Sequence, residues 1–86
     1  MGETREVRIK RLRMRSWRRG MKEMDLILGP FADGPLASLD DEGLAHYERL
    51  LEENDQDLYK WVSGAAPRPD AHAALIGTIA GFHGIS

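Results

Sequence analysis

The stretch "SLDDEGLAHYERLL", residues 38–51, carries the clearest structural signal in the chain. Leu39 and Leu44 flank Asp40 as a hydrophobic staple flanks a helix N-cap. The next two residues are acidic, and the helix dipole favours acids in a first turn. Apolar side chains then recur at helical spacing and predict a buried stripe of Leu44, Tyr47, Leu50 and Leu51.

Two further helices are predicted before this stretch. The segment of residues 4–16 alternates locally, but its content of arginine, lysine and leucine favours helix. The apolar residues at 21, 24, 28 and 31 form one stripe and predict a helix from about Gly20 to Phe31. Gly29 and Pro30 are expected to break or tighten its end. The turn formers in "ADGPLAS" predict a loop.

Two more helices are predicted after the stretch. Asp55 is the expected N-cap of a short helix that Gly64 terminates. "AAPRP" reads as a linker, Pro69 suits a first helical position, and a last helix is expected over about residues 70–80. No strand-and-turn pattern is present, so the prediction is all-α, a compact bundle of five short helices in a single domain over residues 1–86. The expected core is Met21, Met24, Leu28, Phe31, Leu44, Tyr47, Leu51, Trp61, Leu75 and Ile79, with Leu58, Val62 and Phe82 also facing inward.

Composition narrows the classes of function. The 86 residues are 42% hydrophobic and 30% charged, which fits a folded domain with a modest core. The absence of cysteine excludes a disulfide scaffold, a cysteine zinc site and a thiol nucleophile. No apolar run approaches the roughly 20 residues of a membrane span, so direct membrane insertion is not expected.

Charge is distributed unevenly along the chain. Residues 1–23 hold nine lysines and arginines against three acids, a balance of +6, while residues 24–86 have a balance of −8. This asymmetry indicates either an anionic partner or internal charge pairing. Arg8, Arg11 and Arg15 share one helical face, which is expected to be solvated or to meet an acidic partner surface.

No catalytic arrangement is visible in the sequence. His46, His72 and His83 fall in no recognised metal-ligand pattern and are read as solvated or core histidines. The serines lack a nucleophile-elbow context, and the paired acids fit helix ends and solvent faces. Gly77 and Gly81 do not follow a strand, so they form no dinucleotide fingerprint. The prediction is that the protein is not an enzyme.

The stretch "SWRRGMKEMD", residues 16–25, has two readings. Arg19 and Glu23 are spaced as an exposed i,i+4 pair, and Gly20 suits a helix junction. Alternatively, the planar donors of Arg18 and Arg19 dock on a protein, Gly20 lets another backbone approach, and Glu23 faces outward. A solvent-facing Gly20 is expected to accept larger side chains without loss of stability.

These residues also resemble a known family. "RRGMKEMD" resembles the RGxxE signature of the small succinate dehydrogenase flavinylation factors, the SdhE-like assembly factors, with Arg19, Gly20 and Glu23 in the motif and Asp25 after it. The likeness continues through "PF", "SLDDE", "YERLLE" and "DQDLYKW". It covers residues 17–61, about half the chain, and is weakest over residues 1–16 and 82–86.

The resemblance implies a small helical bundle with a role in assembly. Such proteins bind the flavoprotein subunit of succinate dehydrogenase, and in some bacteria fumarate reductase, and promote covalent attachment of FAD to a histidine of that client. No stably bound cofactor is expected, since FAD becomes attached to the client protein. By similarity, the partner-binding residues are Arg15, Arg18, Arg19, Gly20, Glu23 and Asp25, and metal ligands are not expected.

Two other functions compete with this reading. The Arg-rich first helix suits a small nucleic-acid-binding protein, although the acidic remainder and the lack of a known motif argue against nucleic acid as a partner. An enzyme in its own right would need a nucleophile and base that the sequence does not supply. The free protein is expected to be a monomer. A bacterial cytoplasm is the expected location, in preference to the mitochondrial matrix, because the signature begins within twenty residues of the start.

Overall fold

The helix predicted from residues 38–51 is present as α3 (Asp41–Leu50). The Asp40 side chain accepts a hydrogen bond from the Gly43 N–H at 2.7 Å, which confirms the predicted N-cap. Leu39 is half-buried against the core and Leu44 is fully buried, as the staple requires. This computed structural model describes residues 2–85, so residues 1 and 86 of the expected domain lie outside the described part.

The first predicted helix is α1 (Arg5–Trp17). Thr4 caps it, because its hydroxyl oxygen accepts a hydrogen bond from the Val7 N–H at 3.2 Å. The helical reading of this segment is therefore confirmed. Only Leu12 and Ser16 of α1 are fully buried, so the helix rests on the rest of the protein along a narrow line.

The second helix, α2 (Lys22–Asp33), begins and ends about two residues later than predicted. Pro30 lies inside it, although proline in a helix interior costs about 3 kcal/mol. The helix continues because the next two residues, Phe31 and Ala32, are almost completely buried. Burial of these side chains offsets the lost backbone hydrogen bond.

Part of the predicted loop "ADGPLAS" is regular structure. Its first residues end α2, and Pro35–Ser38 form a 3-10 helix, η1. Leu36 is fully buried and fixes this turn to the core. The turn formers alone predicted a loop, because nothing in their pattern indicated that Leu36 would be buried in the core.

The fourth helix, α4 (Asp55–Ser63), has a different cap from the predicted one. Asn54 is the N-cap, and its side-chain oxygen accepts hydrogen bonds from the N–H groups of Gln56 and Asp57. Asp55 is instead the first helical residue, and its carboxylate is used in an ion pair with Arg19. Gly64 ends the helix with a φ of 84°, as predicted.

The last helix is α5 (Asp70–Phe82), and Pro69 is its N-cap rather than its first helical residue. Leu75 and Ile79 face the core as predicted. Phe82 does not face fully inward, because it is 47% exposed, although its ring makes an edge-to-face contact with Phe31. The prediction that Phe82 lies on the buried face was therefore wrong.

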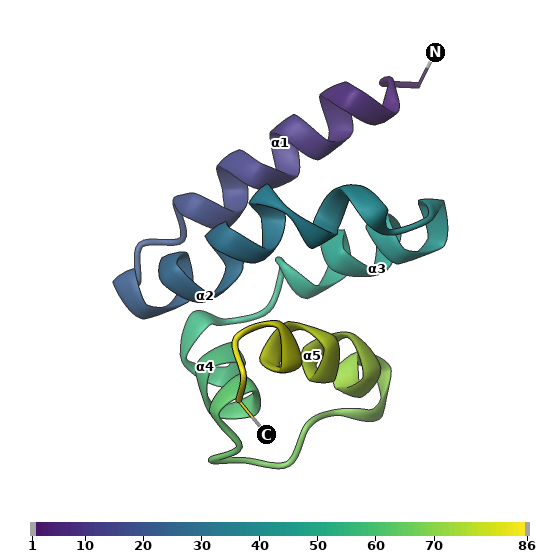
Figure 1. Cartoon of the computed structure of the whole chain (residues 1–86). Coiled ribbons are helices and arrows are strands. Elements are labelled where there is room, and N and C mark those ends of the chain that lie inside the picture. Colours follow the sequence, from purple (N-terminus) through teal and green to yellow (C-terminus); the bar gives the residue numbers. More distant parts are fainter. Residues whose placement is uncertain (1, 86) are drawn as a thin grey trace.

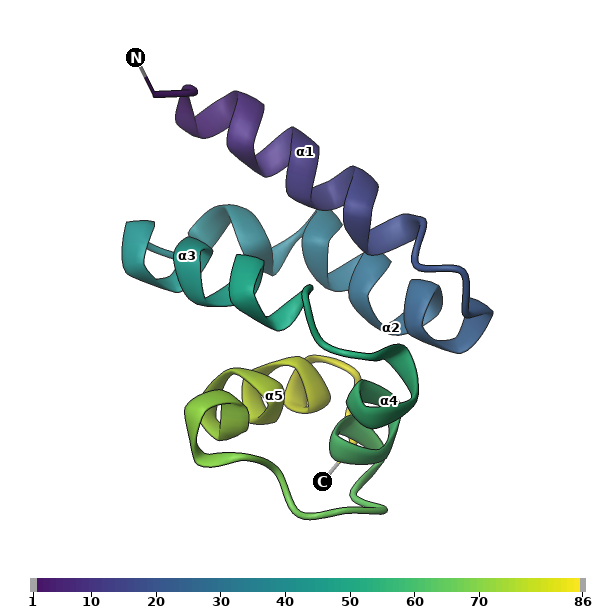
Figure 2. The same ribbon diagram turned by 180° about the vertical axis from the view of Figure 1, so that it is seen from behind.

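The helices form three layers (Figures 1 and 2). α2 and α3, with η1 between them, make the middle layer. α1 crosses one side of this layer, and α4 and α5 cover the other, so the described termini lie on opposite sides. Residues 2–85 contain five α-helices and no strand, which confirms the all-α prediction.

Most of the expected core is buried between these layers. Eight of its ten predicted members are buried, and Leu58 and Val62 are buried as well. Met21 and Trp61 are only partly buried and pack on the edge of the core. Within residues 2–85, the structure has no helix of the length and apolar character needed to cross a membrane.

Candidate functional site

The loop between α1 and α2 contains the signature glycine. Gly20 precedes the helix that was predicted to start with it, and its φ is 90°, a conformation that other residues adopt only with strain. A Cβ atom built on Gly20 meets no atom within 4 Å. The position is thus sterically open, but the expectation that it accepts larger side chains at no cost is wrong, because the backbone conformation is left-handed.

Arg19 is the residue that fixes this loop from behind. Its side chain is only 9% exposed and its Nε lies 2.7 Å from Asp55 Oδ1. The other guanidinium nitrogens donate to the backbone oxygens of Leu51 and Glu53. The predicted exposure of Arg19 and its pairing with Glu23 are therefore wrong, because the α3–α4 connection and the first residue of α4 together supply three better acceptors for the guanidinium.

The side chain of Asp25 holds the backbone of the same loop. The Asp25 carboxylate accepts a hydrogen bond from the Arg19 N–H at 2.7 Å. Arg18 and Glu23 are exposed, and no ion pair involving either is present within residues 2–85. Of the six predicted partner-binding residues, Arg18, Gly20 and Glu23 are thus free to contact a partner, while Arg19 and Asp25 shape the loop.

A polar hollow lies beside the loop. It encloses about 590 Å³ and joins the start of α2 to the start of α4, and its lining residues are Gly20, Met21, Lys22, Glu23, Asn54, Asp55 and Gln56. Asn54, Asp55 and Gln56, at the start of α4, were not predicted as site residues. Their signal was the capping pattern at "NDQD", which was read only as a helix start.

The basic face of α1 is paired within the molecule. Arg8 and Arg11 both contact Glu48 of α3, and Arg15 contacts Glu52. Arg11 also pairs with Glu3, and its hydrogen bond holds the pKa of that carboxyl below the usual value. Internal charge pairing therefore accounts for part of the charge asymmetry. The expectation that this face is simply solvated is wrong, because Glu48, Glu52 and Glu3 supply carboxylates to it, while a partner-facing role for Arg15 stays a prediction.

Two of the histidines, His46 of α3 and His72 of α5, lie next to each other. His72 is 8% exposed, and its Nε2 lies 2.9 Å from a Glu53 carboxylate oxygen. Its Nδ1 lies 3.4 Å from Nε2 of His46. The reading of His72 as a core histidine is confirmed, whereas this pairing had no sequence signal. Residues 2–85 contain no group of three or more histidines and acids that could hold a metal ion.

The buried hydroxyl groups form a structural chain. Ser16 Oγ donates to the Leu12 backbone oxygen at 2.8 Å, so the Tyr47 hydroxyl, 2.6 Å away, is left to donate to Ser16. Burial raises the pKa of Tyr47 to about 12.

The described helices hold the open Gly20 loop in place from behind, and a polar hollow lies beside that loop. These features are typical of a small helical interaction protein.

Comparison with known proteins defines that class further. A family model described as "Flavinator of succinate dehydrogenase" matches residues 10–83, and the chain belongs to this family. The match includes the Arg19–Gly20–Glu23 signature and all but the first turn and a half of α1. The family resemblance inferred from the signature is confirmed.

Several relatives bear the name "Succinate dehydrogenase assembly factor 2, mitochondrial". The protein of Meyerozyma guilliermondii is 44% identical over 72 residues, covering 80% of this chain and 53% of the relative. The Aspergillus terreus protein is 47% identical over 57 residues, covering 66% of this chain and 19% of the relative. The Danio rerio protein is 36% identical over 73 residues, covering 83% and 46%. The chain thus spans about half or less of the length of these relatives. No solved structure matches the chain significantly.

Proposed function

We propose that this protein binds the flavoprotein subunit of succinate dehydrogenase and promotes covalent attachment of FAD to a histidine of that subunit. The observation that carries the proposal is the family match over residues 10–83, because it includes the whole loop and hollow described above. The chemistry belongs to the client, in which the attacking histidine and the flavin both reside. This protein would contribute binding and orientation.

The client-facing surface in this proposal is the exposed side of the α1–α2 loop. Gly20 offers an open backbone, and Arg18 and Glu23 offer charges of opposite sign on either side of it. Arg19 and Asp25 would act behind the surface by keeping the loop in one conformation. Arg15 belongs to the proposed surface only at its margin, because its guanidinium is paired with Glu52. A preformed loop reduces the entropy lost on docking.

Promotion of flavin attachment follows from selective binding. The protein must bind one client conformation better than the others, since equal affinity for all would shift no equilibrium. If the favoured conformation places the histidine against the flavin, proximity and orientation speed the attachment step. FAD would be held by the client, and we propose no stable flavin site on this chain.

The test compares Gly20→Arg with Gly20→Ala. Both substitutions impose an L side chain on the left-handed backbone of Gly20, so both lower stability to a similar extent, on the order of 1 kcal/mol. Only arginine adds bulk above the loop. In cells that depend on this protein, Gly20→Arg should abolish covalent flavin on the client, measured as fluorescence of the denatured client in a gel, while Gly20→Ala retains most of it. Equal flavin fluorescence for both variants would refute docking at Gly20.

The setting of this activity belongs to the same proposal. We expect a monomer when free, which light scattering checks, and a client that is succinate dehydrogenase or fumarate reductase, which copurification from native cells identifies. A bacterial cytoplasm remains our expected location, and cell fractionation tests it against the mitochondrial location that the relatives' names give for those proteins.

A further inference from the structure

The outward face of α1 exposes apolar side chains in a line. Val7, Met14 and Trp17 are 53%, 50% and 38% exposed. With Lys10 they fall at positions i, i+3, i+7 and i+10, so they share one side of the helix. The line runs about 15 Å along the axis. At its C-terminal end Trp17 contacts α2, and the line lies apart from the arginines that pair with Glu48 and Glu52.

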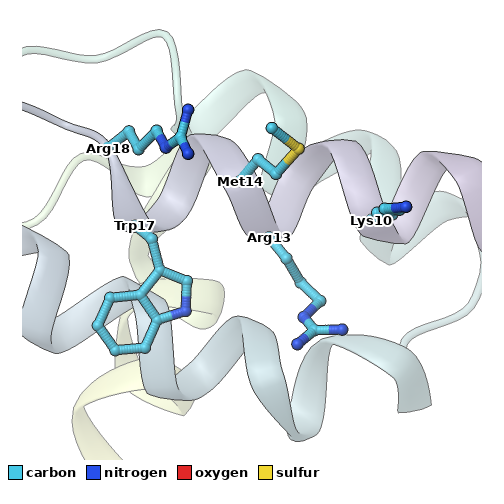
Figure 3. Close-up of a pocket in the computed structure, with 5 residues that line it drawn as sticks. All are labelled: Lys10, Arg13, Met14, Trp17 and Arg18. Atoms are coloured by element: carbon cyan, nitrogen blue, oxygen red, sulfur yellow. The ribbon is translucent and has the colours of Figure 1, made fainter.

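A groove lies along this line (Figure 3). It encloses about 320 Å³ and is lined by Lys10, Arg13, Met14, Trp17 and Arg18. In Figure 3, Trp17 and Arg13 flank one side of the helix axis, and Met14 and Arg18 flank the other. The groove therefore combines two apolar side chains with three cations.

The tryptophan wall of the groove is held in place. Trp17 Nε1 donates to Asp33 Oδ1 at 3.1 Å, and Arg13 Nε donates to the same oxygen at 3.1 Å. The indole lies so close to Gly29 that a Cβ there would be 2.4 Å from the ring. Contact with α2 thus covers one ring face and fixes its orientation. A fixed aromatic wall lowers the entropy cost of binding.

The groove also carries charge that the molecule does not neutralise. Arg8 and Arg11 pair with Glu48 of α3, and Arg15 pairs with Glu52, just after α3. Lys10 and Arg18 make no ion pair with any residue of the part that the structure describes, residues 2–85. They lie eight residues apart, about 12 Å along the helix. Two turns of a second helix cover about the same distance.

We propose that this groove binds an acidic amphipathic helix of a protein partner. Carboxylates two turns apart on that helix would meet Lys10 and Arg18, and apolar side chains between them would pack on Met14 and the open edge of Trp17. Charge complementarity of this kind selects and orients a partner. The covered face of Trp17 leaves little room for base stacking, and three apolar side chains are too few for stable membrane anchoring, so a protein helix fits the groove best.

The proposal shares Arg18 with the proposed docking surface but does not require docking at Gly20, and it can be tested with designed peptides. The probe is a 15-residue amphipathic peptide with leucines at i, i+3, i+4 and i+7 and glutamates flanking them; its counterpart carries lysines at the glutamate positions. Titration into the isotopically labelled protein, followed by NMR, should shift the α1 resonances and the Trp17 indole N–H with the acidic peptide. The lysine peptide should bind at least tenfold more weakly, and added salt should weaken acidic-peptide binding.

Variants locate the binding. Met14→Glu and Lys10→Glu should each weaken the acidic peptide about tenfold or more, and melting curves should show that both variants stay folded, because both side chains are exposed. Lys60→Glu makes the same charge change at an exposed position of α4 and should leave the affinity for the acidic peptide within twofold. Gly20→Arg should also leave it unchanged. Equal binding of both peptides, shifts centred on the Gly20 hollow, or binding only to single-stranded DNA or anionic vesicles would each overturn the proposal.

Discussion

Arg19 and Asp55 form an ion pair of 2.7 Å that joins the α1–α2 loop to the first turn of α4. The pair is largely shielded from water, since the two side chains are 9% and 21% exposed. The same guanidinium also donates to two backbone oxygens of the α3–α4 connection. One side chain therefore fixes the positions of three helices around the signature glycine.

Replacing Arg19 tests this arrangement. Arg19→Ala would leave the Asp55 carboxylate and two carbonyl oxygens without their donors, and should lower the free energy of unfolding by about 3 kcal/mol. Arg19→Lys keeps the charge but has no planar fork, so it should recover only part of that loss. Thermal and urea unfolding measure both variants. Arg18→Ala, at an exposed neighbour, should change stability by less than about 0.5 kcal/mol. A stable Arg19→Ala protein would mean that the ion pair contributes little.

Tyr47 predicts a dependence of stability on alkaline pH. Burial raises its pKa to about 12, whereas an unfolded tyrosine has a pKa near 10. Between these values the unfolded chain has lost the phenolic proton and the folded protein keeps it, so stability falls as pH rises from about 10 to 12. The loss attributable to Tyr47 should be on the order of 2 kcal/mol and should be absent in Tyr47→Phe. Urea unfolding across this pH range measures it.

Tyr59→Phe is the matched control for this experiment, because Tyr59 is 39% exposed. Its alkaline stability profile should follow that of the unaltered protein. At neutral pH, Tyr47→Phe should cost about 1 kcal/mol for the lost hydrogen bond to Ser16. If Tyr47→Phe and Tyr59→Phe lose stability equally at high pH, the phenol of Tyr47 is not the group that titrates.

The parts of the fold that followed from the sequence are those set by local signals. Asp40 as N-cap, Gly64 as terminator and the stripe through Tyr47 depend on residues within a few positions of one another, and all three are present. Burial of Phe31 was also predicted from its stripe, but the continuation of α2 through Pro30 and the burial of Leu36 in η1 depend on packing against distant segments. Local turn chemistry did not predict these two features.

The site shows the same division between local and distant causes. The sequence located the signature at Arg19, Gly20 and Glu23, but the i,i+4 spacing of the two charges suggested the wrong pairing. The acceptors that hold Arg19 lie more than thirty residues away, in the α3–α4 connection and at the start of α4. Hydrogen bonds to such distant acceptors cannot be predicted from the spacing of the residues around Arg19. The pairing of Arg8 with Glu48 and of Arg15 with Glu52 could not be predicted for the same reason.

Gly29 predicts a change of opposite sign from another helical glycine. A Cβ at Gly29 would lie 2.4 Å from the Trp17 ring, so Gly29→Ala must displace the indole and break its hydrogen bond to Asp33. This should cost about 1–2 kcal/mol net of the gain in helix propensity. Tryptophan emission should shift to longer wavelength. Gly81→Ala in α5 meets no atom within 4 Å and should raise stability by up to about 1 kcal/mol. Stabilisation by Gly29→Ala would show that Trp17 is free to move.

Glu23 and Asp25 give the sharpest separation between binding and folding, because both are acids in the first turn of α2. Glu23 is exposed and faces the hollow, and it makes no ion pair within residues 2–85, so Glu23→Ala should change stability by less than about 1 kcal/mol, mainly through the helix dipole. If Glu23 contacts the client as proposed, this variant should lose covalent flavin on the client while melting almost normally.

Asp25→Ala removes the acceptor of the Arg19 N–H and should cost about 1–2 kcal/mol more than Glu23→Ala. Its loss of client flavin should then follow its loss of folded protein, and should diminish at lower growth temperature. Melting curves together with in-gel flavin fluorescence at two temperatures distinguish the two cases. Normal client flavin with Glu23→Ala would remove Glu23 from the docking surface, whereas a fall in melting temperature as large as that of Asp25→Ala would make it a structural residue instead.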